Sequence, residues 1–269
     1  MIATAPARDA LDAAVTALAA AGCHTPRLDA ELLMADALGV DRATLVADPA
    51  MPVPAAAART IGERVRRRTA REPVAYILGR KGFRHIELLV DARVLIPRPE
   101  TELLVEVALG LPHGARVHEV GTGSGAVALA LLDERPDLRV SASDVSPAAL
   151  AVARANAARL GLEVELSRTG GLPEGLAADL VLANMPYVAG HEWPGLQPEI
   201  TRYEPRAALV SGADGLDAIR ALVAQAVPGT RLALEHAPGQ ARAVRDLLSD
   251  AETRRDLARR ERVTVGHAT

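Results

Sequence analysis

The sequence predicts an α/β protein that begins with a small all-helical region. Apolar residues recur at helical spacing over residues 7–71, and from residue 116 onward short β-prone runs alternate with helical runs. Such alternation is typical of a mostly parallel sheet with helices on both faces. We therefore expect a helical domain at 1–78, a β-hairpin linker at 79–98 and an α/β domain at 99–269.

The composition excludes several classes of protein. The chain has 269 residues, of which 49% are hydrophobic and 24% charged, as in globular proteins. A net charge of −3 and only 2% aromatic residues argue against binding a nucleic-acid backbone or stacking on bases. Cys23 has no second cysteine, and the histidines lack metal-ligand spacing, so we expect no disulfide, no metal and a reducing cytoplasm. The sequence shows neither an apolar run long enough to span a membrane nor a signal peptide, so we do not expect the protein to associate with a membrane.

Four helices are expected in the helical domain. Gly22 and Gly39 follow the first two, and glycine favours the left-handed conformation that ends a helix. Asp41 is the expected cap of the third, because its side chain can accept from the first free backbone N–H groups. The expected ranges are 7–21, 28–38, a short helix through residue 46, and 55–71.

The fourth of these helices is strongly basic. Its arginines are Arg59, Arg64, Arg66, Arg67, Arg68 and Arg71. A solvated helix face explains this pattern without any function. A patch that docks an acidic protein surface or RNA is the alternative.

The linker and the α/β domain have their own element pattern. The predicted hairpin pairs 83–89 with 92–96 across a turn at Val90-Asp91, and a helix is expected at 100–109. The expected strands are 116–120, 139–143, 164–167, 180–183, 231–235 and 261–265, and the expected helices are 125–133, 147–160, 216–227 and 239–248.

A glycine-rich turn and an acidic residue follow the first two strands of the α/β domain. The turn reads Gly121-Thr122-Gly123-Ser124-Gly125, and its glycines allow a sharp bend and close approach to a ligand. Alone it can be a plain strand-to-helix connection, because its spacing differs from the dinucleotide-binding fingerprint. Asp144 ends the next strand, where a carboxylate can accept both ribose hydroxyls, or can cap a helix in competition with Ser146. Together the two features predict a nucleoside-cofactor site.

A third motif, Asn184-Met185-Pro186-Tyr187, follows the strand at 180–183. The side-chain carbonyl of Asn184 and the backbone carbonyl beside it can both accept from one NH2 group. Tyr187 can cover the planar group that carries this nitrogen. A strand-ending turn with a buried tyrosine is the alternative, and the nucleoside site in the same sheet favours the binding interpretation.

These motifs, together with Leu95-Ile96-Pro97-Arg98-Pro99-Glu100-Thr101-Glu102, resemble the protein-glutamine methyltransferase family that modifies peptide-chain release factors. That family is a branch of the class I S-adenosylmethionine-dependent methyltransferases. The resemblance runs nearly end to end and implies their Rossmann-like sheet. Further similar blocks lie at 27–33, 72–79, 203–206, 235–236 and 262–263.

The sequence also departs from the family pattern. Met185 stands where the family usually has Pro, and Glu119 stands where Asp is usual. The loop at 169–172 lacks the acidic residue that usually lies near the adenine, which leaves backbone groups and packing by Leu172 for that contact.

The resemblance implies a reaction and a set of site residues. A methyl group would move from S-adenosylmethionine, leaving S-adenosylhomocysteine, to the side-chain amide nitrogen of the glutamine in the Gly-Gly-Gln motif of class I release factors. Arg98 and Thr101 would border the substrate site, and catalysis would fall to Asn184, Met185, Pro186 and Tyr187. The implied cofactor-binding residues are Glu119, Gly121, Thr122, Gly123, Ser124, Gly125, Asp144, Val145, Leu172 and Asn184.

The same resemblance implies how the partner is engaged. The helical domain and the segment 188–212 would present the release factor, and we expect a monomer without direct nucleic-acid contact. Two other functions stay open. An adenine amino-methyltransferase acting on nucleic acid faces the same geometry, and a non-catalytic methyltransferase-like module that binds release factors or ribosomes would explain Met185 and the missing loop acid.

Overall fold

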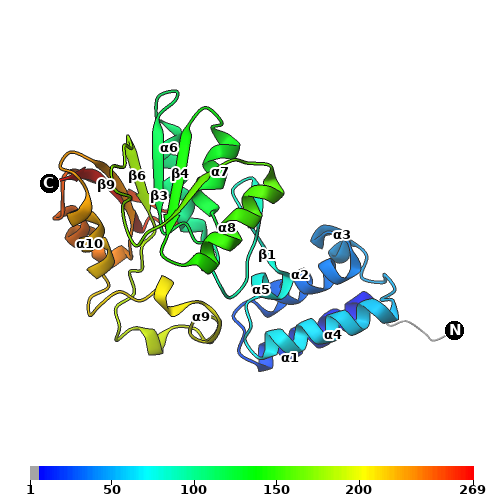
Figure 1. Cartoon of the computed structure of the whole chain (residues 1–269). Coiled ribbons are helices and arrows are strands. Elements are labelled where there is room, and N and C mark those ends of the chain that lie inside the picture. Colours follow the sequence, from blue (N-terminus) through cyan, green and yellow to red (C-terminus); the bar gives the residue numbers. More distant parts are fainter. Residues whose placement is uncertain (1–5) are drawn as a thin grey trace. The chain divides into compact units, whose positions relative to one another are not determined.

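The computed structural model describes residues 6–269, which form two units (Figure 1). One unit comprises residues 6–79 together with Gln197–Tyr203, and the other comprises Arg80–Leu196 and Glu204–Thr269. The helical unit is therefore discontinuous in sequence. The sequence placed 197–203 in the α/β domain, whereas the structure groups it with the helices, because Glu199 supplies a carboxylate to buried arginines there.

The helical unit contains the four expected helices and two short ones that were not predicted. Asp41 caps the third helix as expected, since its Oδ1 accepts from the Thr44 N–H at 2.6 Å. The two additional helices span five and six residues, too few to show a helical period. The helices are α1 (Ala7–Ala20), α2 (Pro26–Leu38), α3 (Arg42–Ala47), α4 (Ala55–Thr69), α5 (Val74–Leu78) and α9 (Pro198–Tyr203).

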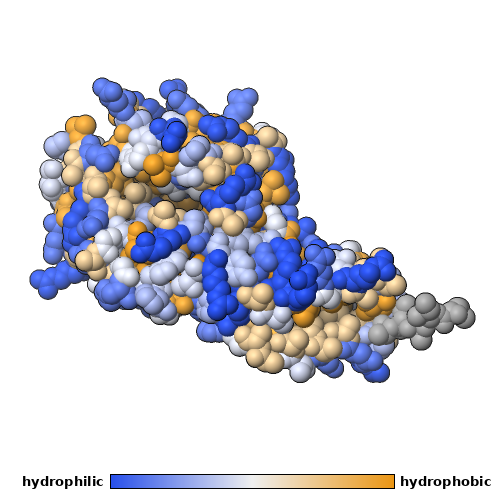
Figure 2. Space-filling view, turned by 60° about the horizontal axis from the view of Figure 1, so that its bottom comes forward, coloured by the Kyte–Doolittle hydropathy of each residue, from blue (hydrophilic) through white to orange (hydrophobic). Residues whose placement is uncertain are grey.

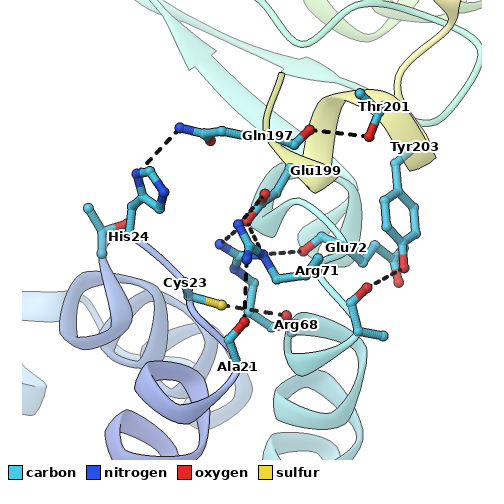
Figure 3. Close-up of polar contacts among 12 residues, drawn as sticks. Ala21, Cys23, His24, Arg68, Arg71, Glu72, Gln197, Glu199, Thr201 and Tyr203 are labelled. Carbon is cyan, nitrogen blue, oxygen red and sulfur yellow. Dashed lines mark hydrogen bonds and ion pairs between the residues drawn. The ribbon is translucent and has the colours of Figure 1, made fainter. Parts of the chain in front are cut away.

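A buried ion cluster joins α2, α4 and α9 within the helical unit. Figure 3 shows its side chains Arg68, Arg71 and Glu199. Arg68 is 5% exposed; its Nε lies 2.7 Å from Asp29 and its Nη2 lies 2.8 Å from Glu199. Arg71 binds both carboxylate oxygens of Glu199. Two cations thus share two anions, which is the pairing that buried charges require.

The basic character of α4 is largely explained by partners inside the unit. Arg64 donates to the Leu33 carbonyl at 3.0 Å, and Arg67 donates to Glu72. Only Arg59 and Arg66 of the six arginines are exposed. Neither a solvated face nor a docking patch therefore describes the other four side chains.

The α/β unit consists of a hairpin and a seven-stranded sheet with helices. Its helices are η1 (Pro99–Thr101), α6 (Glu102–Leu109), α7 (Ala126–Glu134), α8 (Pro147–Leu160), η2 (Trp193–Gly195), η3 (Arg206–Ala208), α10 (Asp217–Gln225), η4 (Pro238–Gln240) and α11 (Ala241–Arg245). Its strands are β1 (Arg80–Phe83), β2 (Ile86–Leu89), β3 (Arg116–Val120), β4 (Arg139–Asp144), β5 (Glu165–Arg168), β6 (Leu180–Ala183), β7 (Arg231–Glu235), β8 (Leu248–Arg255) and β9 (Glu261–Ala268).

The strand order of the sheet is β5-β4-β3-β6-β7-β9-β8, and β3 to β7 run parallel. Strand β6 shows that both faces of the sheet are covered. Leu180 and Leu182 pack in one apolar core with α6 and α7, while Val181 packs in another with α10. From β3 the chain first adds β4 and β5 on one side, and then adds β6 and β7 on the other side, so the strand order reverses between β3 and β6. Ligands in such sheets bind beyond the carboxyl ends of the strands at this switch point.

The predicted hairpin is wrong in its position. Strand β1 pairs with β2, Phe83 lies opposite Ile86, and the turn is Arg84-His85, where Arg84 has a φ of +48°. Phe83 and Ile86 are both buried in the core of the α/β unit, which selects this register. No strand forms at 92–96, because Asp91 starts a turn there and its carbonyl accepts from the Val94 N–H at 3.1 Å.

The predicted helix at 239–248 is also too long. Helix α11 ends at Arg245, and Leu248 begins β8, which pairs antiparallel with β9 at the edge of the sheet. The sequence of β8 is mostly polar and exposed, as is common in edge strands, so it lacks the apolar pattern of a strand.

The surface mixes hydrophilic and hydrophobic residues, and a hollow lies in the visible face of the α/β unit (Figure 2). Few large apolar side chains are well exposed; Val145 is one of them, at 65%. Over residues 6–269, no helix has both the length and the apolar character that crossing a membrane requires.

Candidate functional site

A cavity of about 270 Å³ opens where β3, β4 and β6 end. Gly121 and Gly123 reach it from β3, Asp144 from β4 and Asn184 from β6. Three motifs that lie far apart in the sequence therefore meet at the switch point of the sheet. Its remaining lining residues are Arg93, Val94, Leu95, Val120, Val145, Ser146, Ala149, Thr169, Gly170, Met185, Pro186, Pro205, Ala207, Ala208 and Ala218.

The glycine turn is held against the neighbouring strand. The backbone N–H groups of Gly121 and Thr122 both donate to the Ser143 carbonyl, at 2.8 Å and 3.0 Å. Gly121 has a φ of +74°, which glycine adopts without strain. At Gly125, where α7 begins, a Cβ would lie 2.9 Å from the Leu129 side chain, so glycine also lets this helix pack closely.

Asp144 holds the glycine turn and borders the cavity. Its Oδ2 accepts from the Gly123 N–H at 2.9 Å, and its Oδ1 accepts from the Ser146 N–H at 2.8 Å. Ser146, not Asp144, is the N-cap of α8, because its Oγ accepts from the Ala149 N–H. Each carboxylate oxygen keeps further accepting capacity, so the arrangement suits two donors of a ligand.

The Asn184 amide has a defined direction at the cavity. Its Nδ2 donates to Thr101 Oγ1 at 3.0 Å, and no described residue hydrogen-bonds to its Oδ1. The amide therefore presents an acceptor for a ligand. The thioether of Met185 packs over the glycine turn, where a Cβ on Gly121 would lie 3.6 Å from Sδ.

Tyr187 lies behind the cavity rather than in its wall. Its hydroxyl donates to Glu235 Oε1 at 3.2 Å, and burial together with the nearby Glu235 carboxylate raises the pKa of the phenol. The turn thus contains a half-buried tyrosine, close to what the plainer interpretation of the motif expected, while Asn184, Met185 and Pro186 line the cavity.

Several predicted cofactor residues lie beneath the cavity wall. Glu119 is 4% exposed, and its Oε2 accepts from Thr122 Oγ1 at 2.6 Å and from the Ala128 N–H at 3.0 Å. Burial raises the pKa of Glu119 to about 7. Thr122, Ser124 and Gly125 also lie outside the lining, so this group supports the loop from below.

Leu172 is separate from the cavity. It borders another hollow with Pro173, and its N–H donates to Gln225 Oε1 at 3.1 Å. Thr169 and Gly170 of the same loop line the cavity instead.

The two residues expected at the substrate border act through neighbours. Arg98 forms an ion pair with Glu204, which also accepts from the Ile96 N–H at 3.1 Å. Thr101 is 5% exposed and supports the Asn184 amide. Neither side chain lines the cavity, and both fix the position of segments that do.

Sequence reasoning assigned no role to two buried polar residues. Asn156, fully buried on α8, accepts from the Leu89 N–H at 2.7 Å and donates to the Leu89 and Ser124 carbonyls. Nothing in the helical pattern of α8 signals this role. Glu235 is 1% exposed at the end of β7, and an acidic residue directly after an apolar strand was an available signal. Between residues 6 and 269 no three His, Cys, Asp or Glu side chains are grouped to hold a metal ion.

Comparison with known proteins identifies the class of this fold and site. The catalytic domain of hMettl16, solved with the MAT2A 3′UTR hairpin 6, has the same fold, with a TM-score of 0.51 and 14% identity over 66% of this chain and 74% of that one. Residues 99–202 match the family model of the methyltransferase small domain, and residues 9–79 match that of the PrmC N-terminal domain. The protein is a methyltransferase.

Full-length relatives then give the family. The release factor glutamine methyltransferase of Xylella fastidiosa strain Temecula1 is 45% identical, over 94% of this chain and 97% of that protein. Its counterpart in Cereibacter sphaeroides is 45% identical, over 91% of this chain and 90% of that protein. The chain belongs to the family of release factor glutamine methyltransferases.

Proposed function

We propose that this protein methylates the side-chain amide nitrogen of the glutamine in the Gly-Gly-Gln motif of class I release factors. The names of its relatives point to a glutamine of a release factor as the substrate. The structural observation that carries the proposal is the direction of the Asn184 amide. Because Nδ2 donates to Thr101, the orientation of the amide is fixed, and Oδ1 is left as an acceptor for a ligand at the cavity.

The chemical difficulty is the weak nucleophilicity of an amide nitrogen, whose lone pair is delocalised into its carbonyl. Asn184 Oδ1 and the Met185 backbone carbonyl would accept the two N–H groups of the target glutamine. These bonds would align the nitrogen for attack and favour the positive charge that develops on it. After the transfer the protonated amide is a strong acid, so its proton can leave to water without a dedicated base.

The methyl donor in this proposal is S-adenosylmethionine, which supplies a methyl group already activated on a sulfonium. The residues present fit such a group. Asp144 would accept from the two ribose hydroxyls, since each of its oxygens makes only one bond within the protein. The glycine turn, Val145 and Thr169 would enclose the rest of the cofactor.

The partner would be a class I release factor, presented by the helical unit and by residues 188–212. We expect the enzyme to act as a cytoplasmic monomer and to contact the factor rather than nucleic acid. The cavity-lining segment around Pro205 follows directly after α9, so the chain connects the helical unit to the wall of the cavity.

A labelling experiment tests the substrate. The protein is incubated with S-adenosylmethionine labelled in its methyl group and with a class I release factor, the same factor with its motif glutamine replaced by alanine, or an adenine-containing oligonucleotide. We expect label only in the unaltered factor. Label in the oligonucleotide would overturn the proposal, and the absence of both labelling and cofactor binding by calorimetry would indicate a non-catalytic module.

A further inference from the structure

Behind the cavity lies a chain of four polar side chains, of which Thr101 and Glu235 are buried and Asn184 and Tyr187 are half-buried. Glu235 is 1% exposed, and its Oε1 accepts from the Tyr187 hydroxyl at 3.2 Å. The neighbouring Thr101 hydroxyl interacts with this carboxyl and lowers its pKa. Thr101 Oγ1 in turn accepts from Asn184 Nδ2 at 3.0 Å. Glu235 Oε2 is the one fully buried side-chain oxygen or nitrogen among residues 6–269 with no hydrogen-bond partner. This carboxyl is therefore not saturated by structural contacts.

The direction of this chain follows from counting protons. A threonine hydroxyl has one proton to donate, and an ionised carboxylate can only accept. Thr101 Oγ1 accepts from Asn184 Nδ2 at 3.0 Å, so its own proton is available for the unsaturated carboxylate of Glu235. If Thr101 were free to donate to Asn184, the amide could turn over and show its NH2 group to the cavity.

We propose that Glu235 is a positioning residue that determines, through the Thr101 hydroxyl, which atom of the Asn184 amide faces the substrate. The inference rests on the proposed function, because an acceptor is needed only if the target carries an NH2 group. With Oδ1 outward the target nitrogen is held by an acceptor. With Nδ2 outward two NH2 groups would face each other and the nitrogen would be displaced.

The charge state of Glu235 decides whether this control operates. Burial raises the pKa of Glu235 to about 7, against the hydrogen bonds from Thr101 and Tyr187 and the positive charge of Arg262; the Glu100 carboxylate adds to the rise. Arg98 lies near the Tyr187 end of the chain. The neighbouring His236 is neutral, since burial lowers its pKa, and its ring nitrogens bind Ala237 and Thr264 instead.

The sign of the pH effect follows. Above about pH 7 Glu235 is ionised and accepts from Thr101, so Asn184 presents Oδ1. Below that pH the carboxyl of Glu235 carries a proton that it can donate to Thr101. Thr101 can then donate to Asn184, so the directions of both hydrogen bonds can reverse. Single-turnover methylation of the release factor should therefore fall as the pH drops through about 7.

The test compares isosteric variants at saturating cofactor. Glu235→Gln replaces one acceptor oxygen with an NH2 group, so we expect the single-turnover rate to fall about 100-fold, the scale of losing one preorganised polar group. Its inflection near pH 7 should disappear, and the Kd for S-adenosylhomocysteine should stay unchanged. Thr101→Val, which lacks the hydroxyl, should show the same loss of rate and of the inflection as Glu235→Gln. Thr101→Ser, which keeps the hydroxyl, should retain the wild-type rate and inflection. Glu252→Gln, on the exposed edge strand, is the matched control.

A second measurement, by NMR, reports the hydrogen bonding of the Asn184 amide and does not depend on enzyme activity. In 15N-labelled protein bound to S-adenosylhomocysteine, the Asn184 side-chain NH2 signal, assigned by its loss in Asn184→Ala, should shift in Glu235→Gln and Thr101→Val but not in Thr101→Ser. Wild-type rate and pH profile in Glu235→Gln, or an unshifted NH2 signal, would overturn the inference. If the wild-type protein fails to methylate the factor, the proposed function fails, and the NH2 signal still decides the positioning role.

Discussion

The guanidinium of Arg71 binds both carboxylate oxygens of Glu199 at 2.8 Å and 2.7 Å, although 128 residues separate them in the sequence. Arg68 binds the same carboxylate. A helix as short as α9 is not stable by itself in water. These buried ion pairs therefore stabilise α9 in the helical unit.

We predict that Glu199→Gln lowers the free energy of unfolding by about 3–5 kcal/mol, because removing one partner leaves buried arginine charge uncompensated. Urea unfolding of the variant and of the wild-type protein measures the difference. Glu252→Gln, whose carboxylate is largely exposed, is the control and should change stability by less than about 1 kcal/mol. Equal small effects in both variants would show that the cluster does not stabilise the fold.

The same cluster predicts a pH effect. Burial alone would raise the pKa of Glu199, but the hydrogen bonds from Arg71 and Arg68 outweigh it and lower the pKa from 4.5 to about 2. A depressed pKa stabilises the folded state above the unfolded value and loses this contribution as the pH falls toward the folded value. Stability should therefore decrease between about pH 4.5 and pH 2. In Glu199→Gln the contribution of Glu199 to this loss of stability should be absent. If the variant loses as much stability over this pH range as the wild-type protein, other carboxyl groups cause the loss.

Asp144→Ala should weaken the binding of S-adenosylhomocysteine by about 1.5–3 kcal/mol if both ribose hydroxyls bind the carboxylate. Part of this loss would come from releasing the Gly123 N–H, which Asp144 holds. Isothermal titration calorimetry gives the affinity, with Asp246→Ala, an exposed residue directly after α11, as the control. An unchanged Kd would show that Asp144 only shapes the turn.

The Asn184 turn separates a side-chain role from a backbone role. Asn184→Ala deletes one acceptor and should raise the barrier by about 2.7–4 kcal/mol. Met185→Pro keeps the carbonyl and removes an N–H that no described group accepts, so it should keep or slightly raise the rate. Met185→Ala should lower the rate little. Single-turnover methylation compares the three variants.

One result would contradict this division. If Met185→Ala damages the rate as much as Asn184→Ala while cofactor affinity is unchanged, the thioether shapes the substrate pocket. The contact of Sδ with the glycine turn makes cofactor affinity the control to measure alongside.

Asn156→Leu should destabilise the α/β unit by about 1–3 kcal/mol, since it leaves backbone groups of Leu89 and Ser124 buried without partners. Because Ser124 belongs to the glycine turn, the variant should also bind S-adenosylhomocysteine less tightly. Thermal unfolding with and without this ligand measures both effects. A lower melting temperature with unchanged affinity would limit Asn156 to the hairpin contact.

The parts of the fold that could be predicted carry a strong local pattern. The buried strand β6 is a continuous apolar run, and α8 begins with a Ser-Pro cap and ends at Gly161. The hairpin was misplaced because 83–96 contains two candidate turns, and only the burial of Phe83 and Ile86 selects between them. That packing is a tertiary property that local propensity does not contain.

The candidate site shows the same division. The motifs that reach the cavity through backbone turns, such as Asn184 and Asp144, could be predicted because each follows a strand end. Glu119 and Leu172 stand in similar positions, yet they point beneath the cavity or away from it. Side-chain direction at the end of a strand depends on what packs around it, so spacing alone could not separate these cases.

The discontinuity of the helical unit has a consequence for synthesis on the ribosome. Glu199 is made 128 residues after Arg71, which at roughly 5–20 residues per second is a delay of roughly 6–25 s. During that interval α1 to α5 have been translated, and Arg68 has Asp29 as a partner, but the carboxylate of Glu199 is missing for both Arg68 and Arg71. The nascent N-terminal region must therefore wait in a partly assembled state, and its last ion pairs can close only when the ribosome has passed β6.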